Sequence, residues 1–324
     1  MTQNRYAPDK GLQARMGLTM FMLGLVFVAF VAALIGILYA TGVGTGAIVF
    51  FAVLLGAFLT FGSLFFSDKI ALATARAREI KPEDGRAEAH LHGIVDRLCA
   101  VANMPKPRVA IAPTDMPNAF ATGRSSSKAV LCVTEGLLRR LDDRELEGVI
   151  AHEMSHVAHK DVVVMTVASF IGIMAALLVR MGFYAELFGG GGGRGRGGNN
   201  QAPIALIMLA MMVIGMITYA ISFLLIRLLS RYRELAADRS GALLTGQPSA
   251  LASALVKVSG AMASIPTKDL RQAEPLSAFY FAPALRPDGA NGKGHTSIAT
   301  IFSTHPSLER RLQQLSEISA QLGR

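Results

Sequence analysis

The sequence predicts a mainly α-helical membrane protein with two transmembrane helical hairpins and an α+β part outside the bilayer. Of its 324 residues, 52% are hydrophobic and only 17% are charged. This composition is typical of a membrane protein with a substantial polar part. Four apolar stretches without a charged residue approach or exceed the roughly 20 residues that cross the hydrocarbon core of a bilayer. They are residues 18–40, 47–66, 162–179 and 202–226.

The first two apolar stretches predict one hairpin. They are joined by the short uncharged turn at residues 41–46, whereas basic residues precede the first stretch and follow the second. Because positively charged flanks stay on the cytoplasmic side of a membrane, both ends of this hairpin are expected there. The first stretch is too long for the apolar region of a cleaved secretory signal and has no cleavage site.

The third and fourth apolar stretches predict a second hairpin. Three arginines follow the fourth stretch and indicate that the chain returns to the cytoplasmic side. The link at residues 189–200 is nearly all glycine, and its Arg194 and Arg196 run slightly against the same charge rule. It lacks the Lys-Ser/Thr pair of a phosphate-binding loop, so it is interpreted as a flexible linker.

These stretches divide the chain into five segments. They are a cytoplasmic N-terminus at residues 1–17, a transmembrane hairpin at 18–66, a cytoplasmic part at 67–161, a second hairpin at 162–226 and a cytoplasmic part with a C-terminal helix at 227–324. Within the last segment, the Pro- and Gly-rich residues 264–300 predict a loop.

The cytoplasmic part at 67–161 shows both helical and β patterns. Residues 86–103 carry apolar residues at helical spacing and predict a helix, on which His90 and His92 are expected to face solvent. Three short β-prone runs, separated by Pro, Gly and Ser, then predict a small sheet. These runs are residues 108–112, 119–122 and 129–134.

The strongest chemical signal is the run His152-Glu153-Met154-Ser155-His156. On a helix, residues four apart share one face, so both imidazoles can reach a single ion. Zinc suits imidazole ligands, and a site with three protein ligands and one water is catalytic rather than structural. Glu153 lies beside that water and can take its proton, which is the chemistry of peptide-bond hydrolysis. Asp142 and Glu145 form a capping-box pattern that begins this helix.

A third metal ligand must come from elsewhere in the chain. His159 is seven residues after His152, about 10 Å along the helix axis, which is too far for one zinc ion. Glu234 is the better candidate, because Asp238 lies four residues later on the same face and could accept the free N–H of a zinc-bound histidine. The alternative is a solvated acidic pair in a basic segment. The predicted hairpin at 162–226 would bring Glu234 back beside His156.

The second β-prone run could bind a peptide substrate if it lies at the edge of the sheet. An edge strand has unpaired backbone groups, to which an extended peptide can add as a further strand. An ordinary core strand fits the pattern equally well. The candidate substrate-binding residues are Asn118, Ala119, Phe120, Ala121, Thr122 and Gly123.

Four parts of the chain carry the decisive motifs: residues 152–156, 118–123, 230–238 and 304–308. Together they resemble the HtpX-type membrane zinc metalloproteases, which are relatives of the CAAX prenyl proteases. The resemblance covers their order, spacing and hydropathy, from the first hairpin to the C-terminal helix. It implies a zincin-like protease domain in a four-span endopeptidase of the bacterial inner membrane, with its active site and both termini in the cytoplasm. The implied role is quality control of misfolded or damaged membrane proteins under stress.

The resemblance also implies roles for single residues. One zinc ion per chain would be held by His152, His156 and Glu234, with Glu153 as the general base. Asp238 would hydrogen-bond a zinc-bound histidine without contacting the zinc itself. The substrate strand would be residues 118–123. His305 is similar to a histidine near the zinc that gates the water or stabilises the oxyanion; alternatively, it merely precedes a helix whose first turn contains Pro306.

Other classes of function are disfavoured. A non-catalytic zinc-binding scaffold or adaptor would leave Glu153 without a task, and a transporter usually has charged residues inside its spans. A prenyl-protein processing enzyme has more spans than four. The net charge of +9 is largely explained by the flanks of the spans, and without a recognition motif or basic–aromatic interleaving no nucleic-acid partner is expected. The expected partners are therefore unfolded membrane proteins or peptides and the lipid bilayer.

Overall fold

The protein is described by a computed structural model over seven parts of its chain, which form two compact units. The described residues are 10–41, 54, 56–58, 60–62, 64–189, 201–263 and 305–323. The sheet unit comprises Met1–Ala14, Leu64–Val163 and Ser230–Arg324, and the helical unit comprises Arg15–Ser63 and Val164–Leu229. The expected turn at 41–46, all of the glycine-rich link except Gly189, the loop at 264–300 and part of the second apolar stretch lie outside the described residues.

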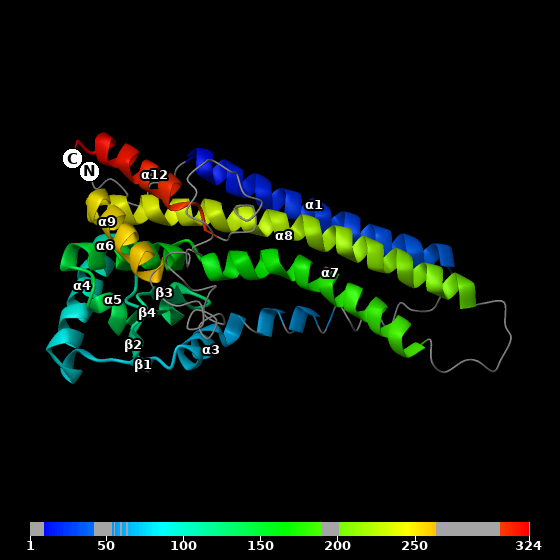
Figure 1. Ribbon diagram of the computed structural model, residues 1–324, viewed down its shortest axis with the longest axis horizontal. Coiled ribbons are helices and arrows are strands. Elements are labelled where there is room, and N and C mark those ends of the chain that lie inside the picture. The colour runs from blue at the N-terminus through cyan, green and yellow to red at the C-terminus, as the bar shows by residue number, and fades with distance from the viewer. Residues whose placement is uncertain are drawn as a thin grey trace. The chain divides into compact units, whose positions relative to one another are not determined.

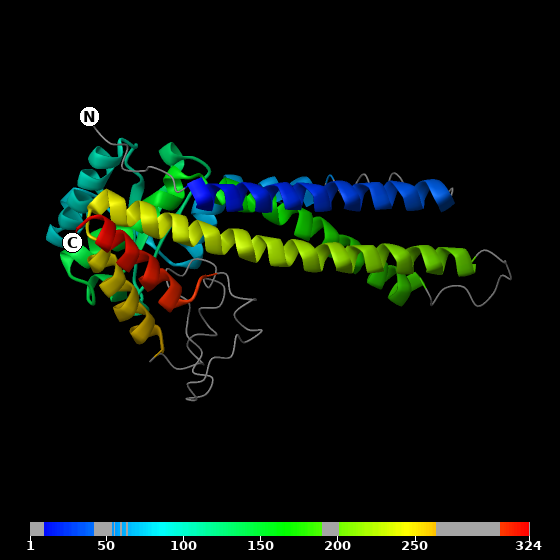
Figure 2. The same cartoon turned by 90° about the horizontal axis from the view of Figure 1, so that it is seen from above.

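Long helices form the helical unit. These are α1 (Lys10–Thr41), α7 (Asp161–Gly189) and α8 (Gln201–Thr245), and each of them also contributes residues at one end to the sheet unit. Figure 1 and Figure 2 both show α1 and α8 side by side, and Leu23 of α1 packs with Ala168 of α7 and Leu229 of α8. A helix satisfies its backbone hydrogen bonds internally, as a membrane span must. Among the described residues, Lys10–Ile37 and Leu209–Thr245 are helices long and apolar enough to cross a bilayer.

The sheet unit contains a four-stranded mixed sheet. Its strands are β1 (Arg78–Glu79), β2 (Arg108–Ala112), β3 (Ala119–Thr122) and β4 (Val130–Thr134), in the order β1-β2-β4-β3. The β2–β4 pair is parallel and the other two pairs are antiparallel. The three runs predicted as strands are confirmed, and β3 lies at one edge. Strand β1 was not predicted, because two residues are too few for a sequence pattern.

Among the residues that the structure describes, the helices that accompany this sheet are α3 (Ser67–Thr74), α4 (Arg86–Ala102), α5 (Glu135–Leu138), α6 (Asp143–Ala158), α9 (Pro248–Ala263) and α12 (Leu308–Gln321). One continuous core joins α4, α6, α9 and α12 to the sheet, with members such as Leu98, Ile150, Leu255 and Leu315. The fold is therefore mostly helical with a small mixed sheet.

Helix α6 begins with the predicted capping box. The Asp142 side chain accepts hydrogen bonds from the backbone N–H groups of Arg144 and Glu145, and the Glu145 carboxylate accepts from the Asp142 N–H at 3.0 Å. Glu145 also accepts from Ser253 Oγ at 2.6 Å and Lys257 Nζ at 2.7 Å, both on α9. Its buried carboxylate thus fixes both the start of α6 and the position of α9.

The expectation for His92 was wrong. Its side chain is buried, and its Nε2 lies 3.0 Å from the backbone oxygen of Ile80. The segment before α4 covers this face of the helix and supplies the acceptor. His90 is on the exposed side as expected, with 54% of its side chain accessible and its Nε2 2.9 Å from Asp143 Oδ1.

Gly241 allows α8 to approach α6 closely. A Cβ atom at this position would lie 2.9 Å from the backbone nitrogen of His152 and 3.1 Å from its Cα. Real Cβ contacts are almost never this short, so any larger residue must push the two helices apart. Because the backbone of His152 cannot move without shifting its side chain, this glycine fixes the distance between α8 and the histidine helix.

We expect Gly241→Ala to destabilise the protein by about 1–3 kcal/mol, the usual effect of forcing an extra methyl group into a packed core. Gly93→Ala is the matched control, because nothing lies within 4 Å of a Cβ atom there. In the control, the free energy of unfolding should stay unchanged or rise by up to about 1 kcal/mol, because alanine has a higher helix propensity than glycine. Urea unfolding of the detergent-solubilised variants measures both. Equal stabilities would show that the helices are not in contact at Gly241.

Candidate metal centre

Three side chains from two helices converge in the sheet unit. His152 and His156 come from α6 and Glu234 from α8, and within the described residues they form one group in which each offers a ligand atom within 4.8 Å of the others. The two Nε2 atoms are 3.2 Å apart. Glu234 Oε2 lies 3.7 Å from His152 Nε2, and Oε1 lies 3.5 Å from His156 Nε2. The three predicted ligands therefore face one point.

The ring nitrogens of the histidines are arranged for metal binding. His152 Nδ1 lies 2.9 Å from Asp238 Oδ1, and His156 Nδ1 lies 2.6 Å from Asp161 Oδ2. A carboxylate beside each Nδ1 favours a proton on that nitrogen, which leaves the lone pair on Nε2. Two lone pairs and a carboxylate would repel one another unless a cation lies between them.

The spacing and the charge of the group both fit a divalent cation. Metal–ligand distances of about 2.0–2.2 Å imply ligand atoms about 3.3–3.6 Å apart in a tetrahedral site, close to the separations here. Around the ligands, four buried carboxyl groups face two buried guanidinium groups, which leaves a net charge of −2 when all four are ionised and the histidines are neutral. Buried charges are tolerated only when they are compensated, so a dication balances the site. The six buried charged residues are Glu153, Glu234, Asp238, Asp161, Arg233 and Arg311.

Glu234 is held as a carboxylate. Burial alone would raise its pKa, but the charge and hydrogen bond of His305, and the charges that His156 and His152 carry when protonated, outweigh it, so the pKa lies well below its ordinary value. Arg311 Nη1 is a further positive group, 3.8 Å from Glu234 Oε2. An ionised oxygen is the form that binds a metal.

Asp238 is fixed by an arginine that sequence patterns did not reveal. Arg311 Nε donates to Asp238 Oδ2 at 2.7 Å and Nη2 donates to Oδ1 at 2.6 Å, and only 1% of the Arg311 side chain is accessible. Burial raises the pKa of Asp238, but Arg311 and His152 outweigh this and lower it. A signal was present in the sequence: Arg311 shares the apolar face of α12 with Leu315 and Ile318, where a charged residue needs a buried partner.

Glu153 lies between the ligands and strand β3. Its side chain is buried, and its Oε2 accepts a hydrogen bond from the Ala121 backbone N–H at 3.1 Å. Burial raises the pKa of Glu153 to about 7, with the negative charge of Glu234 acting in the same direction and His156 against it. A carboxyl group with this pKa can accept and release a proton near neutral pH.

The six candidate substrate-binding residues lie in and around β3. Ala121 donates its backbone N–H to Glu153. Asn118 instead bonds back into the sheet, where its N–H donates to Thr134 Oγ1 at 2.9 Å. Gly123 ends the strand with φ +140°, and a Cβ atom there would lie 2.6 Å from the Lys128 oxygen, so only glycine fits. Ala119, Phe120 and Thr122 are buried.

His305 reaches the third ligand. Its Nδ1 lies 3.1 Å from Glu234 Oε2, and 10% of its side chain is accessible. Helix α12 begins at Leu308 with Ser307 as its N-cap, whose hydroxyl accepts from the Arg310 N–H. Pro306 therefore precedes the cap instead of occupying the first turn, and the start of the helix does not explain the position of His305.

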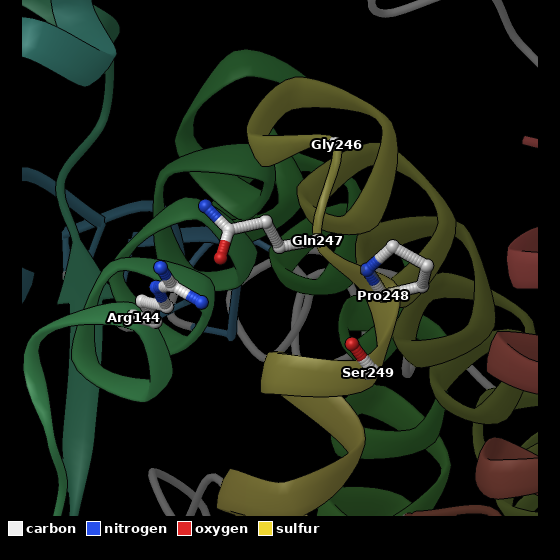
Figure 3. Close-up of a pocket in the computed structure, with 5 residues that line it drawn as sticks. All are labelled: Arg144, Gly246, Gln247, Pro248 and Ser249. Atoms are coloured by element: carbon white, nitrogen blue, oxygen red, sulfur yellow. The ribbon is translucent and has the colours of Figure 1, made fainter. Parts of the chain in front are cut away.

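A pocket of about 330 Å³ lies elsewhere in the sheet unit. It is lined by Arg144, Gly246, Gln247, Pro248 and Ser249, and Figure 3 shows the side chains of Arg144 and Gln247 pointing toward each other. Arg144 precedes His152 by eight residues of α6, about 12 Å along the helix axis. The pocket is thus separate from the metal ligands.

Comparison with known proteins identifies the family. Residues 86–319 match the model of peptidase family M48. The chain belongs to this family. Among similar proteins, it is 54% identical to Protease HtpX homolog 1 of Streptomyces coelicolor, over 99% of this chain and 97% of the relative. It is 49% identical to the Protease HtpX homolog of Moorella thermoacetica, over 97% and 96% of the two chains.

A solved structure shares the fold. The crystal structure of Ste24p from S. mikatae superposes with a TM-score of 0.51 at 16% identity, covering 95% of this chain and 66% of Ste24p. The predicted resemblance to HtpX-type proteases is confirmed. As a member of M48, the chain is a membrane protease of the metallopeptidase type, and its His-His-Glu group could hold the metal.

We expect Glu234→Ala to lose most of its bound metal, because two imidazoles alone leave the cation with one protein ligand too few. Glu147→Ala is the matched control, since Glu147 lies on α6 and pairs with Arg97 at the surface instead. Elemental mass spectrometry of the purified variants measures the metal content per chain and shows whether Glu234 is a ligand. Unchanged content in Glu234→Ala would point to another third ligand.

Proposed function

We propose that the chain is a zinc-dependent endopeptidase of the bacterial inner membrane, which hydrolyses peptide bonds of misfolded or damaged membrane proteins on the cytoplasmic side. One observation carries this proposal: a buried carboxyl group, Glu153, lies beside three converging metal ligands. The proposed ligands of one zinc ion per chain are His152, His156 and Glu234. Two imidazoles and one carboxylate are a ligand set typical of catalytic zinc.

The proposed chemistry divides between the metal and the chain. Zinc, when bound, would polarise the scissile carbonyl and lower the pKa of a water molecule. The Glu153 carboxylate takes a proton from the attacking water as the new C–O bond forms. It returns that proton to the nitrogen of the leaving amine as the C–N bond breaks. Asp238 keeps the Nδ1 proton of His152 in place, and His305 is positioned to donate a hydrogen bond to the developing oxyanion or to gate the water.

We infer that residues 118–123 bind the substrate as an added strand. Strand β3 is at the edge of the sheet, and the Ala121 N–H points at Glu153, away from β4. A peptide that pairs with this edge would pass the general base in an extended conformation, which proteolysis requires. Unfolded segments of membrane proteins can adopt that conformation, which supports a role in quality control and the stress response.

The proposed membrane arrangement has four spans. Hairpins at residues 18–66 and 162–226 would leave residues 1–17, 67–161 and 227–324 in the cytoplasm, with the active site and both termini there. Basic residues that flank the apolar stretches support this orientation. The helices Lys10–Ile37 and Leu209–Thr245, which are long and apolar enough to span, support the first and the last of these spans.

Glu153→Gln is expected to bind zinc like the wild type and to cleave an unfolded reporter protein at least about 100-fold more slowly, because general acid–base catalysis contributes about 10²–10⁴-fold. The assay uses full-length protein in detergent, with metal content measured on the same samples. Glu147→Gln is the control and should retain activity. Cleavage by Glu153→Gln at the wild-type rate would remove Glu153 from the mechanism. A wild type that holds zinc without cutting would favour the alternative, a non-catalytic zinc-binding scaffold or adaptor.

The pH dependence of kcat/KM should show an acidic limb between about pH 5 and about pH 7. The general base must be ionised, and burial raises the pKa of Glu153 to about 7. A bound dication nearby would lower this value by attraction. Activity is therefore full above the pKa and is lost as the pH falls through it. Initial rates between pH 5 and 9, on protein shown to keep its metal, test this; a rate independent of pH over that range would contradict it.

A further inference from the structure

The ring of His156 is held by a buried ion pair. Its Nδ1 lies 2.6 Å from Asp161 Oδ2. The same Asp161 oxygen pairs with Arg233 Nη2, and Arg233 Nη1 donates to the Asp161 backbone oxygen at 3.0 Å. Only 6% of the Asp161 side chain and 4% of the Arg233 side chain are accessible. Water therefore cannot substitute for either partner.

This arrangement repeats the one behind the first histidine. There, His152 Nδ1 faces Asp238 Oδ1 and Arg311 binds the carboxylate with two nitrogens. Each histidine thus has an aspartate at its Nδ1, and each aspartate has a buried arginine. The two sets come from different parts of the chain, since Asp161 begins α7 whereas Asp238 lies in α8.

The backbone between α6 and α7 is shaped to bring Asp161 to His156. Helix α6 ends at Ala158 and α7 starts at Asp161. Between them, Lys160 has φ +56°, in the left-handed region that residues with a Cβ atom rarely adopt. Such a conformation persists only where the surrounding structure holds it in place. It ends the first helix and lets the carboxylate at the start of the second return to a ring five residues earlier.

We propose that Asp161, oriented by Arg233, is a positioning residue for the metal ligand His156; this rests on the proposed metalloprotease function. The carboxylate keeps the proton on Nδ1, so that Nε2 presents its lone pair to the metal, and it makes the imidazole a stronger ligand. Arg233 fixes the direction of the carboxylate and compensates its charge. It also links this support to the third ligand, because Glu234 is the next residue.

A second aspartate in the same protein, Asp143, serves as a matched control for a purely structural role of Asp161. An aspartate in the first turn of a helix is favourable through the helix dipole alone. Asp143 is the first residue of α6 as Asp161 is of α7, but its side chain is 75% accessible and pairs with His90. Asp143→Asn therefore removes the same charge from the same helix position without touching a metal ligand.

The test measures zinc affinity of the full-length protein in detergent by competition with a chromophoric chelator. Asp161→Asn should bind zinc about 10–100-fold more weakly than the wild type, as is usual when a partner of a metal-ligating histidine is lost, and Asp143→Asn should be unchanged. The visible spectrum of the protein saturated with cobalt(II) is the second readout. It should shift in Asp161→Asn, because the ligand field changes even when every site is filled.

Asp161→Asn leaves Arg233 buried without its partner, which could unfold the protein. The double variant D161N/R233M removes both charges and keeps the measurement possible, with the same weaker binding expected. Wild-type zinc affinity and an unchanged cobalt spectrum in either variant overturn the proposal. Neither readout needs cleavage, so a wild type that binds zinc but does not cut would overturn the endopeptidase function alone.

Discussion

Burial of charge is the constraint on which the metal centre depends. Removing an ion from water costs several kcal/mol even after relaxation, and this cost is offset only when partners are close and well directed. Here Glu153, Glu234, Asp238 and Asp161 are buried with Arg233 and Arg311 in one region of the sheet unit. Two arginines cannot balance four carboxylates, so the fold itself provides a site for positive charge. Asp161 and Asp238, whose charges the two arginines compensate, also direct both imidazoles toward the cation.

The helices bring these groups together because their backbones are close. Gly241 of α8 lies against the backbone of His152, and on the same helix Asp238 precedes it by three residues and Glu234 by seven, close to one and two turns. The spacing of Glu234, Asp238 and Gly241 therefore places a ligand, a partner of a ligand and a contact point on one face of α8. Nearer the start of α6, its buried capping residue Glu145 binds α9. The histidine helix is thus fixed at its start and along its length before any metal binds.

Much of the secondary structure and the histidine pair of the metal centre could be predicted from local sequence patterns. The histidine pair, its capping box and the strands at 108–112 and 119–122 depend on neighbouring residues, and the structure has these elements at the expected positions. Partners that come from distant parts of the chain could not be found in this way. Arg311 lies 73 residues after Asp238, and Arg233 lies 72 residues after Asp161. The prediction that His92 faces solvent was wrong for a similar reason, since its partner is the backbone oxygen of Ile80, which no pattern of side chains reveals. Asp238 was accessible to prediction because it shares a helix with Glu234.

The long separation between His156 and Glu234 has a physical consequence. The cost of closing a flexible loop rises only with the logarithm of its length, so an insertion of this size costs little more than a short one. Rigid helices at both ends reduce that cost further, because α7 begins at Asp161 and α8 continues unbroken through Glu234. The contact between Asp161 and Arg233 then joins the two ends of the insertion directly beside the ligands. A ligand set that is already oriented in this way loses little conformational entropy when the cation arrives, and more of the binding energy remains to hold it.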